Sequence, residues 1–181
     1  MKKSLLLVAV MALSMASYGQ FRVGLGLIGG IPSGSFGDIT DFGIGGYIEP
    51  KVSLNDLEVG VHLGGMAFAG ANIDTGAGSV GLSATTVIPI LAIGQYYLDV
   101  PGVTPYFGLG LGPYIVDGGS ASGSAGGGTF TADVESTTKF GVAPKIGINI
   151  GGFDIGAAYH IVSDLNFLAI NLGFHIGKRA G

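Results

Sequence analysis

The chain lacks cysteine and tryptophan altogether and has few charged residues. The absence of cysteine excludes a disulfide framework and a lipid attached to cysteine at a signal cleavage site. Charged residues make up 11% of the chain, against about 25% in an ordinary soluble domain. The formal net charge of −4 and the lack of a basic cluster argue against nucleic acid as a partner. The fold must therefore be held together without disulfides, and its composition is not that of a typical soluble protein.

Glycine and apolar residues take the place of charge. Glycine accounts for 36 of the 181 residues, against an average of about 7%, and it lacks the strict triplet period of collagen. Apolar residues make up 48% of the chain. Low charge combined with high apolar content indicates contact with lipid.

The N-terminal residues are predicted to be an export signal. A basic start precedes an apolar core from Leu5 to Leu13, which is too short to span a membrane as a mature helix. Small residues follow, and cleavage after Gly19 fits the small-residue rule, with cleavage after Ala16 as the alternative. We therefore expect a signal peptide at residues 1–19 and a single domain at residues 20–181.

A helical membrane protein is the first alternative for such a composition. The longest uncharged stretch, Thr75 to Leu98, is long enough to cross a bilayer. It contains four glycines, two consecutive threonines and Pro89, a composition that disfavours a helix even in lipid. Membrane-spanning strands are therefore the better interpretation.

The stretch from Lys139 to Val162 carries the clearest strand signal. Two runs of alternating residues flank Gly151-Gly152, a dipeptide suited to the two-residue turn of a β-hairpin. When the second run folds back on the first, one face is apolar and the other is small or polar, and a one-residue slip would mix the faces. The expected apolar pairs are Ile150–Phe153, Ile148–Ile155, Ile146–Ala157, Pro144–Tyr159 and Val142–Ile161, and the opposite pairs are Asn149–Asp154, Gly147–Gly156, Lys145–Ala158 and Ala143–His160.

Eight segments with strand character follow the signal and predict an all-β fold. In the fourth segment both faces are apolar, so its facing stays open. Pro89 and Pro144 fall within strands and remove ladder donors, so we expect bulges or unpaired positions there. The eight segments are Phe21–Ile28, Phe42–Val52, Leu57–Phe68, Leu82–Leu98, Thr104–Val116, Lys139–Ile150, Phe153–Val162 and Phe167–Ile176.

The connections between these segments alternate in length. Long connections at Gly29–Asp41, Ala69–Gly81 and Asp117–Thr137 alternate with short ones at Ser53–Asp56, Asp99–Val103 and Gly151–Gly152, and only Ser163–Asn166 breaks the rule by being short. Tight periplasmic turns and longer outside loops are typical of an outer-membrane barrel. Closure also removes the sheet edges that would leave unpaired backbone groups in lipid. The pattern predicts an eight-stranded antiparallel up-and-down transmembrane β-barrel with both termini in the periplasm.

Aromatic residues gather near the strand ends, where two interfacial girdles are expected. Scattered aromatics in an ordinary β core are the alternative, because aromatics are enriched in strands generally. The expected girdle at the short-turn end is Phe21, Tyr96, Tyr97, Tyr106, Phe153 and Phe174, and the one at the opposite end is Phe42, Phe68, Tyr114, Phe140, Tyr159 and Phe167.

With these features, the chain resembles the small outer-membrane β-barrel proteins of the porin family, particularly those of the Bacteroidetes type. The stretches that carry the resemblance are the signal ending in Gly19-Gln20, GGIPSGSFGD at 29–38, VIPILAIGQYYLDVPGVTPYFGLGLG at 87–112 and the final alternating strand. The resemblance implies a location in the bacterial outer membrane, contact with its lipids, and insertion by the outer-membrane assembly machinery, which recognises the last strand. Leu172, Phe174 and Ile176 fit that strand, although the chain ends in Gly177-Lys178-Arg179-Ala180-Gly181 instead of a terminal aromatic residue.

The facing rule places a set of polar side chains inside the barrel. Buried charges are costly unless they are paired, so we expect a network of ion pairs and hydrogen bonds. An interior of eight strands is just wide enough for side chains to fill, which favours a plug, and a polar lining of a narrow pore is the alternative. The predicted interior residues are Glu49, Lys51, Glu58, His62, Lys145, Asn149, Asp154, His160, Asn171 and His175, with Lys139 near the outer end.

No catalytic, cofactor or metal site is predicted. His160, Ser163 and Asp164 lie close together in sequence, but nothing in their spacing supplies the hydrogen-bonded geometry of a nucleophile and its base. The three histidines lie on separate segments without metal-ligand spacing. The acidic pairs Asp38 with Asp41 and Asp133 with Glu135 lack EF-hand spacing, and loop carboxylates are usually solvated.

We therefore expect a monomeric, non-enzymatic barrel with a structural or surface-interaction role and at most weak passage of small solutes. Within the Asp117–Thr137 connection, the stretch Asp117–Thr131 is predicted to be a flexible outside loop, and the sequence does not identify a ligand for it. Two alternatives stay open: a narrow porin-like channel, and a secreted lipocalin-like barrel that binds apolar ligands.

Overall fold

The computed structural model of the protein describes residues 21–70, 72–74, 78–117, 119–125, 128–133 and 135–177. The predicted signal peptide at residues 1–19 lies outside this part of the chain.

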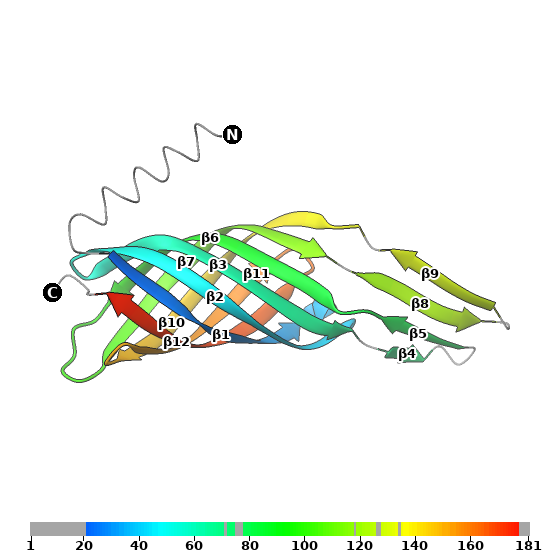
Figure 1. Cartoon of the computed structure of the whole chain (residues 1–181), viewed down its shortest axis with the longest axis horizontal. Helices are drawn as coiled ribbons and strands as arrows, with labels where there is room; N and C mark the ends of the chain where they lie inside the picture. Colours follow the sequence, from blue (N-terminus) through cyan, green and yellow to red (C-terminus); the bar gives the residue numbers. More distant parts are fainter. Residues whose placement is uncertain are drawn as a thin grey trace, which may run out of the picture.

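Eight long antiparallel strands close into a barrel (Figure 1). Each strand pairs with its neighbours along the chain, in the order β1-β12-β11-β10-β7-β6-β3-β2, and β1 closes the sheet on β12. The predicted eight-stranded antiparallel up-and-down barrel is confirmed. Its strands are β1 (Phe21–Ser33), β2 (Thr40–Leu54), β3 (Leu57–Gly70), β6 (Thr85–Tyr97), β7 (Thr104–Asp117), β10 (Thr137–Ile150), β11 (Phe153–Val162) and β12 (Asn166–Gly177).

The β10–β11 hairpin has the predicted register, with Ile150 opposite Phe153 and Lys145 opposite Ala158. Gly151 and Gly152 both have positive φ, 57° and 99°, as a type I′ hairpin turn requires. The ladder to β11 skips the two residues between Val142 and Lys145, one of which is the predicted weak position, Pro144. The ladder between β3 and β6 is interrupted in the same way at Pro89, between the Leu63–Ile90 and Met66–Val87 pairs. The expected local loss of pairing at both prolines is therefore confirmed.

The first predicted connection, Gly29–Asp41, is wrong in length. Strand β1 continues to Ser33 and β2 begins at Thr40, so only six residues remain between them, including the short 3-10 helix η1 (Gly34–Phe36). Glycine and proline at 29–32 suggested a loop, but these residues pair with β12 along their whole length. Pairing by backbone groups on the far strand outweighed the local preference of the sequence.

Two of the predicted loops are instead strands of a second sheet. The strands β4 (Asn72–Asp74), β5 (Gly78–Leu82), β8 (Ser120–Ala125) and β9 (Gly128–Asp133) pair in the order β4-β5-β8-β9. We call this the extended sheet; it continues beyond the barrel at the end opposite the start of β1 and the end of β12 (Figure 1). The connections predicted at 69–81 and 117–137 are long, as expected. The prediction of a flexible loop at 117–131 is wrong for the described residues, because β5 and β8, about forty residues apart, pair through their backbones.

A pair of serines lies at the base of the extended sheet. The Ser83 backbone N–H donates to the Ser120 carbonyl at 2.9 Å, and the Ser120 N–H donates to Ser83 Oγ at 2.5 Å. These bonds join the connection between β5 and β6 to the first residue of β8. The two segments that lead from the barrel into the extended sheet are thus hydrogen-bonded to each other at its base.

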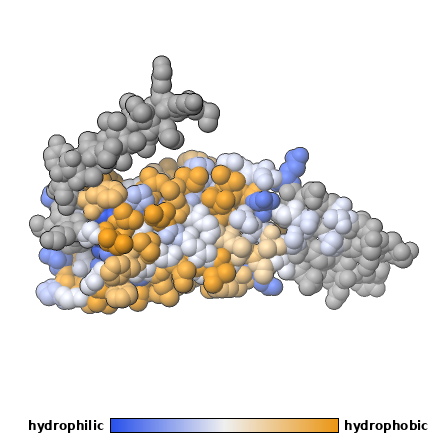
Figure 2. All heavy atoms as spheres, viewed as in Figure 1, coloured by the Kyte–Doolittle hydropathy of each residue, from blue (hydrophilic) through white to orange (hydrophobic). Residues whose placement is uncertain are grey.

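The outward faces of the barrel strands are apolar. Every barrel strand contributes large exposed apolar side chains, for example Leu27, Ile44, Leu63, Ile88, Leu109, Ile146, Ile155 and Leu172. Figure 2 shows apolar residues covering much of the visible flank of the barrel. Among the described residues, no helix is long and apolar enough to cross a membrane.

The aromatic residues divide between the two faces, so the predicted girdles are only partly correct. Neighbours on a strand point to opposite sides, and of the consecutive Tyr96 and Tyr97 only Tyr96 lies outside. Phe42, Phe140, Phe153, Tyr159 and Phe174 are also exposed on the outer surface. Phe68, Tyr97, Tyr106, Tyr114 and Phe167 are instead buried inside the barrel, contrary to the prediction.

Candidate functional site

The barrel interior is lined by a set of buried polar side chains. Ten of the eleven predicted interior residues are buried: Glu49, Lys51, Glu58, His62, Lys145, Asn149, Asp154, His160, Asn171 and His175. The eleventh, Lys139, lies partly exposed near the outer end and donates to the Ser163 carbonyl at 2.7 Å, with Asp164 at 3.7 Å.

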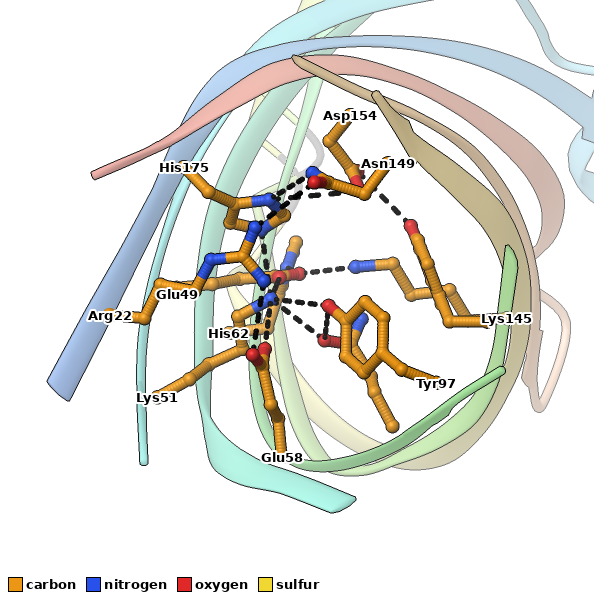
Figure 3. Close-up of polar contacts among 12 residues, drawn as sticks. Arg22, Glu49, Lys51, Glu58, His62, Tyr97, Lys145, Asn149, Asp154 and His175 are labelled. Atoms are coloured by element: carbon orange, nitrogen blue, oxygen red, sulfur yellow. Dashed lines mark hydrogen bonds and ion pairs between the residues drawn. The ribbon is translucent and has the colours of Figure 1, made fainter. Parts of the chain in front are cut away.

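Lys51 is the most connected cation of the interior (Figure 3). Its Nζ lies 3.4 Å from Glu49 Oε2 and 3.3 Å from Glu58 Oε2, between two carboxylates. The same ammonium donates to Gln95 Oε1 at 2.8 Å and lies 3.2 Å from Tyr97 Oη. Its side chain is fully buried, so these partners replace the water that a lysine ammonium normally binds.

Glu49 is the corresponding acidic centre. Its Oε1 accepts from Lys145 Nζ at 2.5 Å and from His62 Nδ1 at 2.9 Å, while Oε2 faces Lys51. The four residues come from β2, β3 and β10. Strands far apart in the sequence are therefore joined across the barrel by a single carboxylate.

Arg22 and His175 extend the network toward the ends of β1 and β12. Arg22 donates from Nη1 to Glu58 at 3.0 Å and from Nη2 to Asn149 Oδ1 at 3.2 Å. His175 lies 2.9 Å from Lys51 Nζ through Nε2 and 2.9 Å from the Asn149 amide through Nδ1.

Asp154 has the weakest pairing of the buried carboxylates. Tyr106 donates its hydroxyl to Asp154 Oδ2 at 3.1 Å, and the His175 ring lies 3.9 Å from Oδ1.

The charges of this network balance. Arg22, Lys51 and Lys145 are offset by Glu49, Glu58 and Asp154, which are all buried. A buried charge persists only when it is paired and hydrogen-bonded, and this set satisfies most of that demand internally. We call it the charged layer, defined by the residues Arg22, Glu49, Lys51, Glu58, His62, Gln95, Tyr97, Tyr106, Lys145, Asn149, Asp154 and His175.

The opposite half of the interior is closed by an aromatic plug, defined by Phe36, Phe68, Tyr114, His160 and Phe167. Phe68 packs edge-on against Phe36 at 4.9 Å and against Phe167 at 5.4 Å between ring centroids. The His160 ring stacks on Phe167 at 4.2 Å, and its Nδ1 lies 2.9 Å from Tyr114 Oη. Phe68, Tyr114 and Phe167 have no exposed surface, so the lumen is filled at this level.

The plug depends on the connection between β1 and β2. Phe36 belongs to η1 and is 2% exposed, which places a loop residue inside the mouth of the barrel. Thr40 Oγ1 donates to the Phe36 carbonyl at 2.7 Å and fixes this short helix to the start of β2. The end of the barrel next to the extended sheet is thus closed by its own loop as well as by its strands.

Comparison with known proteins gives a fold. No family model matches the chain, and no curated protein does. Among solved structures, Neisserial surface protein A (NspA) has a TM-score of 0.53 at 18% sequence identity, over 88% of this chain and 97% of that one. Ail, the attachment invasion locus protein of Yersinia pestis, has a TM-score of 0.52 at 16% identity, over 87% of this chain and 99% of that one. The chain shares their fold.

These neighbours are small bacterial outer-membrane barrels. A second structure, of the Yersinia pestis outer membrane protein Ail in a phospholipid bilayer nanodisc, has a TM-score of 0.46 at 16% identity, over 87% of this chain and 99% of that one. At identities this low, the likeness establishes the fold of the small barrel and nothing finer.

Several members of the charged layer were not predicted. Arg22 follows the alternation of Gly24 and Gly26 on β1, so its inward position was visible in the pattern. Gln95 lies on the strand whose two faces are both apolar, where the pattern does not choose a face. Tyr97 and Tyr106 were predicted to lie in an outer girdle, but the hydroxyl of Tyr97 contacts Lys51 and that of Tyr106 contacts Asp154 inside the barrel.

His160 does not form a catalytic group with Ser163 and Asp164 in the structure. His160 lies inside the plug, in contact with Tyr114 and Phe167. Ser163 lies in the exposed β11–β12 turn, where its hydroxyl donates to Asp164 Oδ2 at 3.1 Å. Within the described part of the chain, no group of three or more acidic or histidine side chains is arranged to hold a metal ion.

Proposed function

We propose that the chain is an integral protein of the bacterial outer membrane with a structural or surface-interaction role. The observation that carries this proposal is the inverted distribution of polarity. Charges are buried in the interior, whereas side chains such as Leu27, Ile44 and Ile146 are each 64% exposed on the outside. A monomeric water-soluble protein rarely exposes an apolar surface of this extent, and a hydrocarbon environment makes it favourable.

The same distribution argues against a secreted lipocalin-like barrel. That alternative requires an interior that receives an apolar ligand and an outer surface that tolerates water. Here half of the interior is occupied by paired charges, and the other half is already filled by the aromatic plug. In the described part of the chain, the interior is therefore polar at one level and filled by aromatic rings at the other, which does not suit an apolar ligand.

The two ends of the barrel support an orientation. The short turns β2–β3, β6–β7 and β10–β11 lie at the end where β1 begins and β12 ends, and the extended sheet lies at the other. Short turns are periplasmic in outer-membrane barrels and longer connections face outward. We propose that the extended sheet lies outside the cell and that the barrel is a monomer surrounded by outer-membrane lipids. We also propose that the outer-membrane assembly machinery inserts it.

A surface role is preferred to transport or catalysis. The plug fills the lumen, which disfavours the porin-like channel as well as weak solute passage. Among the described residues, the Ser163 hydroxyl bonds to the exposed Asp164, while His160 bonds to Tyr114 inside the plug, which gives an enzyme no support from these three residues. The extended sheet supplies a structured element for contact with other molecules. The names of the neighbours, a surface protein and an attachment invasion locus protein, agree with such a role. The signal and the motifs at 29–38 and 87–112 further support a place among the Bacteroidetes-type members of the porin family.

Cysteine labelling on intact cells tests the location and the orientation together. The chain has no native cysteine, so a single introduced thiol is the only target. Ser122→Cys places it on an exposed position of β8, and Asp56→Cys places it in the exposed β2–β3 turn. A membrane-impermeant maleimide should label the Ser122→Cys variant on intact cells, and the Asp56→Cys variant only after the outer membrane is opened.

Each part of the proposal has its own contrary outcome. Protection of both thiols on intact cells, with the protein in the soluble fraction after lysis, would reject an outer-membrane location. Labelling of the β2–β3 turn alone would keep the membrane location and reverse the orientation. Labelling of both variants after lysis is the control that each thiol is reactive.

A further inference from the structure

Between the charged layer and the aromatic plug lies a small space. It measures about 20 Å³ and is lined by the polar residues Glu49, His62, Lys145, His160 and Asn171 together with the small or apolar residues Leu91, Ile93, Gly110, Ala143 and Ala158. A cavity needs roughly 10–15 Å³ of space that a water-sized sphere can occupy to hold one water molecule. The space therefore has room for one water molecule.

Two of the polar residues that line this cavity have a side-chain atom without a hydrogen-bond partner in the described structure. His62 Nε2 and Asn171 Oδ1 are fully enclosed and make no hydrogen bond, while both residues are more than nine-tenths buried. His62 Nδ1 lies 2.9 Å from Glu49 Oε1, and a carboxylate oxygen can only accept, so Nδ1 carries the proton. In the neutral ring, Nε2 is then an acceptor, as Asn171 Oδ1 is.

Lys145 supplies the complementary donor. Its Nζ donates one N–H to Glu49 at 2.5 Å and has two further N–H groups. A species in the cavity must therefore give two hydrogens, to His62 and Asn171, and accept one from Lys145. A metal cation would face the lysine ammonium, and an anion would face the Glu49 carboxylate and two further acceptors, so neither matches this arrangement.

We infer that the cavity is a binding site for a single structural water molecule. The water donates to His62 Nε2 and Asn171 Oδ1 and accepts from Lys145, in the usual range of two to four hydrogen bonds for a buried water. It satisfies the two orphaned acceptors and joins Asn171 of β12 to His62 and Lys145 of the charged layer.

A crystal structure of the mature protein at high resolution tests the site directly. The expected result is one water peak within hydrogen-bond distance of His62 Nε2, Asn171 Oδ1 and Lys145 Nζ. In solution, the ¹⁵N resonance of His62 Nε2 should be that of an unprotonated nitrogen that accepts a hydrogen bond. An empty cavity, or density of an ion in place of water, would overturn the inference.

Two asparagine variants on β12 separate the water from a general effect on the barrel. Asn171→Leu removes one acceptor and fills the cavity, so the His62 Nε2 resonance should move to the value of a nitrogen without a hydrogen bond. Asn166→Leu is the matched control, because Asn166 accepts from the Val162 N–H at the distant turn and should leave His62 unchanged. An unchanged His62 resonance in folded Asn171→Leu would contradict the site, and if this variant does not fold, the native crystal structure decides.

Discussion

Glu49 tests whether the charged layer stabilises the barrel as an electrostatic unit. Glu49→Gln keeps the shape of the side chain and an oxygen that accepts from Lys145 and His62, but it removes the negative charge. Lys51 retains Glu58 at 3.3 Å, whereas Lys145 loses the only carboxylate within 4 Å in the described structure. The variant thus leaves one buried cation without its counter-charge.

The distances set the size of the expected loss. Two unit charges 2.5 Å apart, as Lys145 and Glu49 are, attract by about 7 kcal/mol at an effective dielectric of about 20. Desolvation of both ions offsets much of this, so a buried pair contributes less than its Coulomb energy. Removing one partner leaves the other uncompensated and costs about 3–5 kcal/mol. We expect Glu49→Gln to lower the free energy of unfolding by this amount.

A double-mutant cycle with Lys145→Met isolates the interaction itself. The double variant removes both charges, so its loss should fall short of the sum of the single losses by about 2–3 kcal/mol. The free energy of unfolding is measured by guanidinium titration in lipid vesicles, followed by far-ultraviolet circular dichroism because the chain has no tryptophan. Lys139→Met is the control, since its pair with Asp164 lies at the surface and should contribute about 0–1 kcal/mol.

Additivity would refute this reasoning. If the losses of Glu49→Gln and Lys145→Met add within about 0.5 kcal/mol, the two groups do not interact in the folded barrel. If Lys139→Met costs as much as Glu49→Gln, burial does not set the strength of these pairs.

Two further predictions concern the outer surface and the lumen. Leu109→Arg, near the middle of β7, should lower the free energy of unfolding in lipid vesicles by about 2–4 kcal/mol. Ile176→Arg, near the end of β12, should lower it by only about 0–1 kcal/mol. Small and equal losses would argue against a lipid-facing surface. In planar bilayers the native protein should show no discrete openings. The double variant Phe68→Ala with Phe167→Ala removes two fully buried rings and should produce current steps. Each removed ring should lower the free energy of unfolding by about 3–5 kcal/mol. Regular openings of the native protein would show that the plug does not close the lumen.

The fold was accessible from the sequence because alternation and turn chemistry agree in the barrel strands. The β10–β11 register follows from Gly151-Gly152 and from one apolar face, since a shifted register would place charges in the apolar row. The extended sheet has no such pattern. Its segments are rich in glycine and serine, and they are held by backbone pairing between β5 and β8, which no local property of either segment announces.

The sequence predicts which side chains of the candidate site face the interior, but it does not predict which of them pair with each other. Alternation places Glu49, Lys51 and Lys145 inside, but it does not indicate that Lys145 meets Glu49 rather than Asp154. Those partners are set by strand stagger and barrel closure, which depend on all eight strands together. Arg22 and Asn149 are 127 residues apart in the chain and become neighbours only in the closed barrel.

The distribution of the charged layer over so many strands has a consequence for assembly. Arg22 belongs to the first strand, Lys145 and Asp154 to the sixth and seventh barrel strands, and His175 to the last. A barrel that lacks any one of these strands leaves unpaired charges toward lipid, which is costly. The final pairing of β1 with β12 should therefore complete the ionic interior and the hydrogen-bond ladder in one cooperative event, and partly zipped barrels should persist only while water fills their lumen.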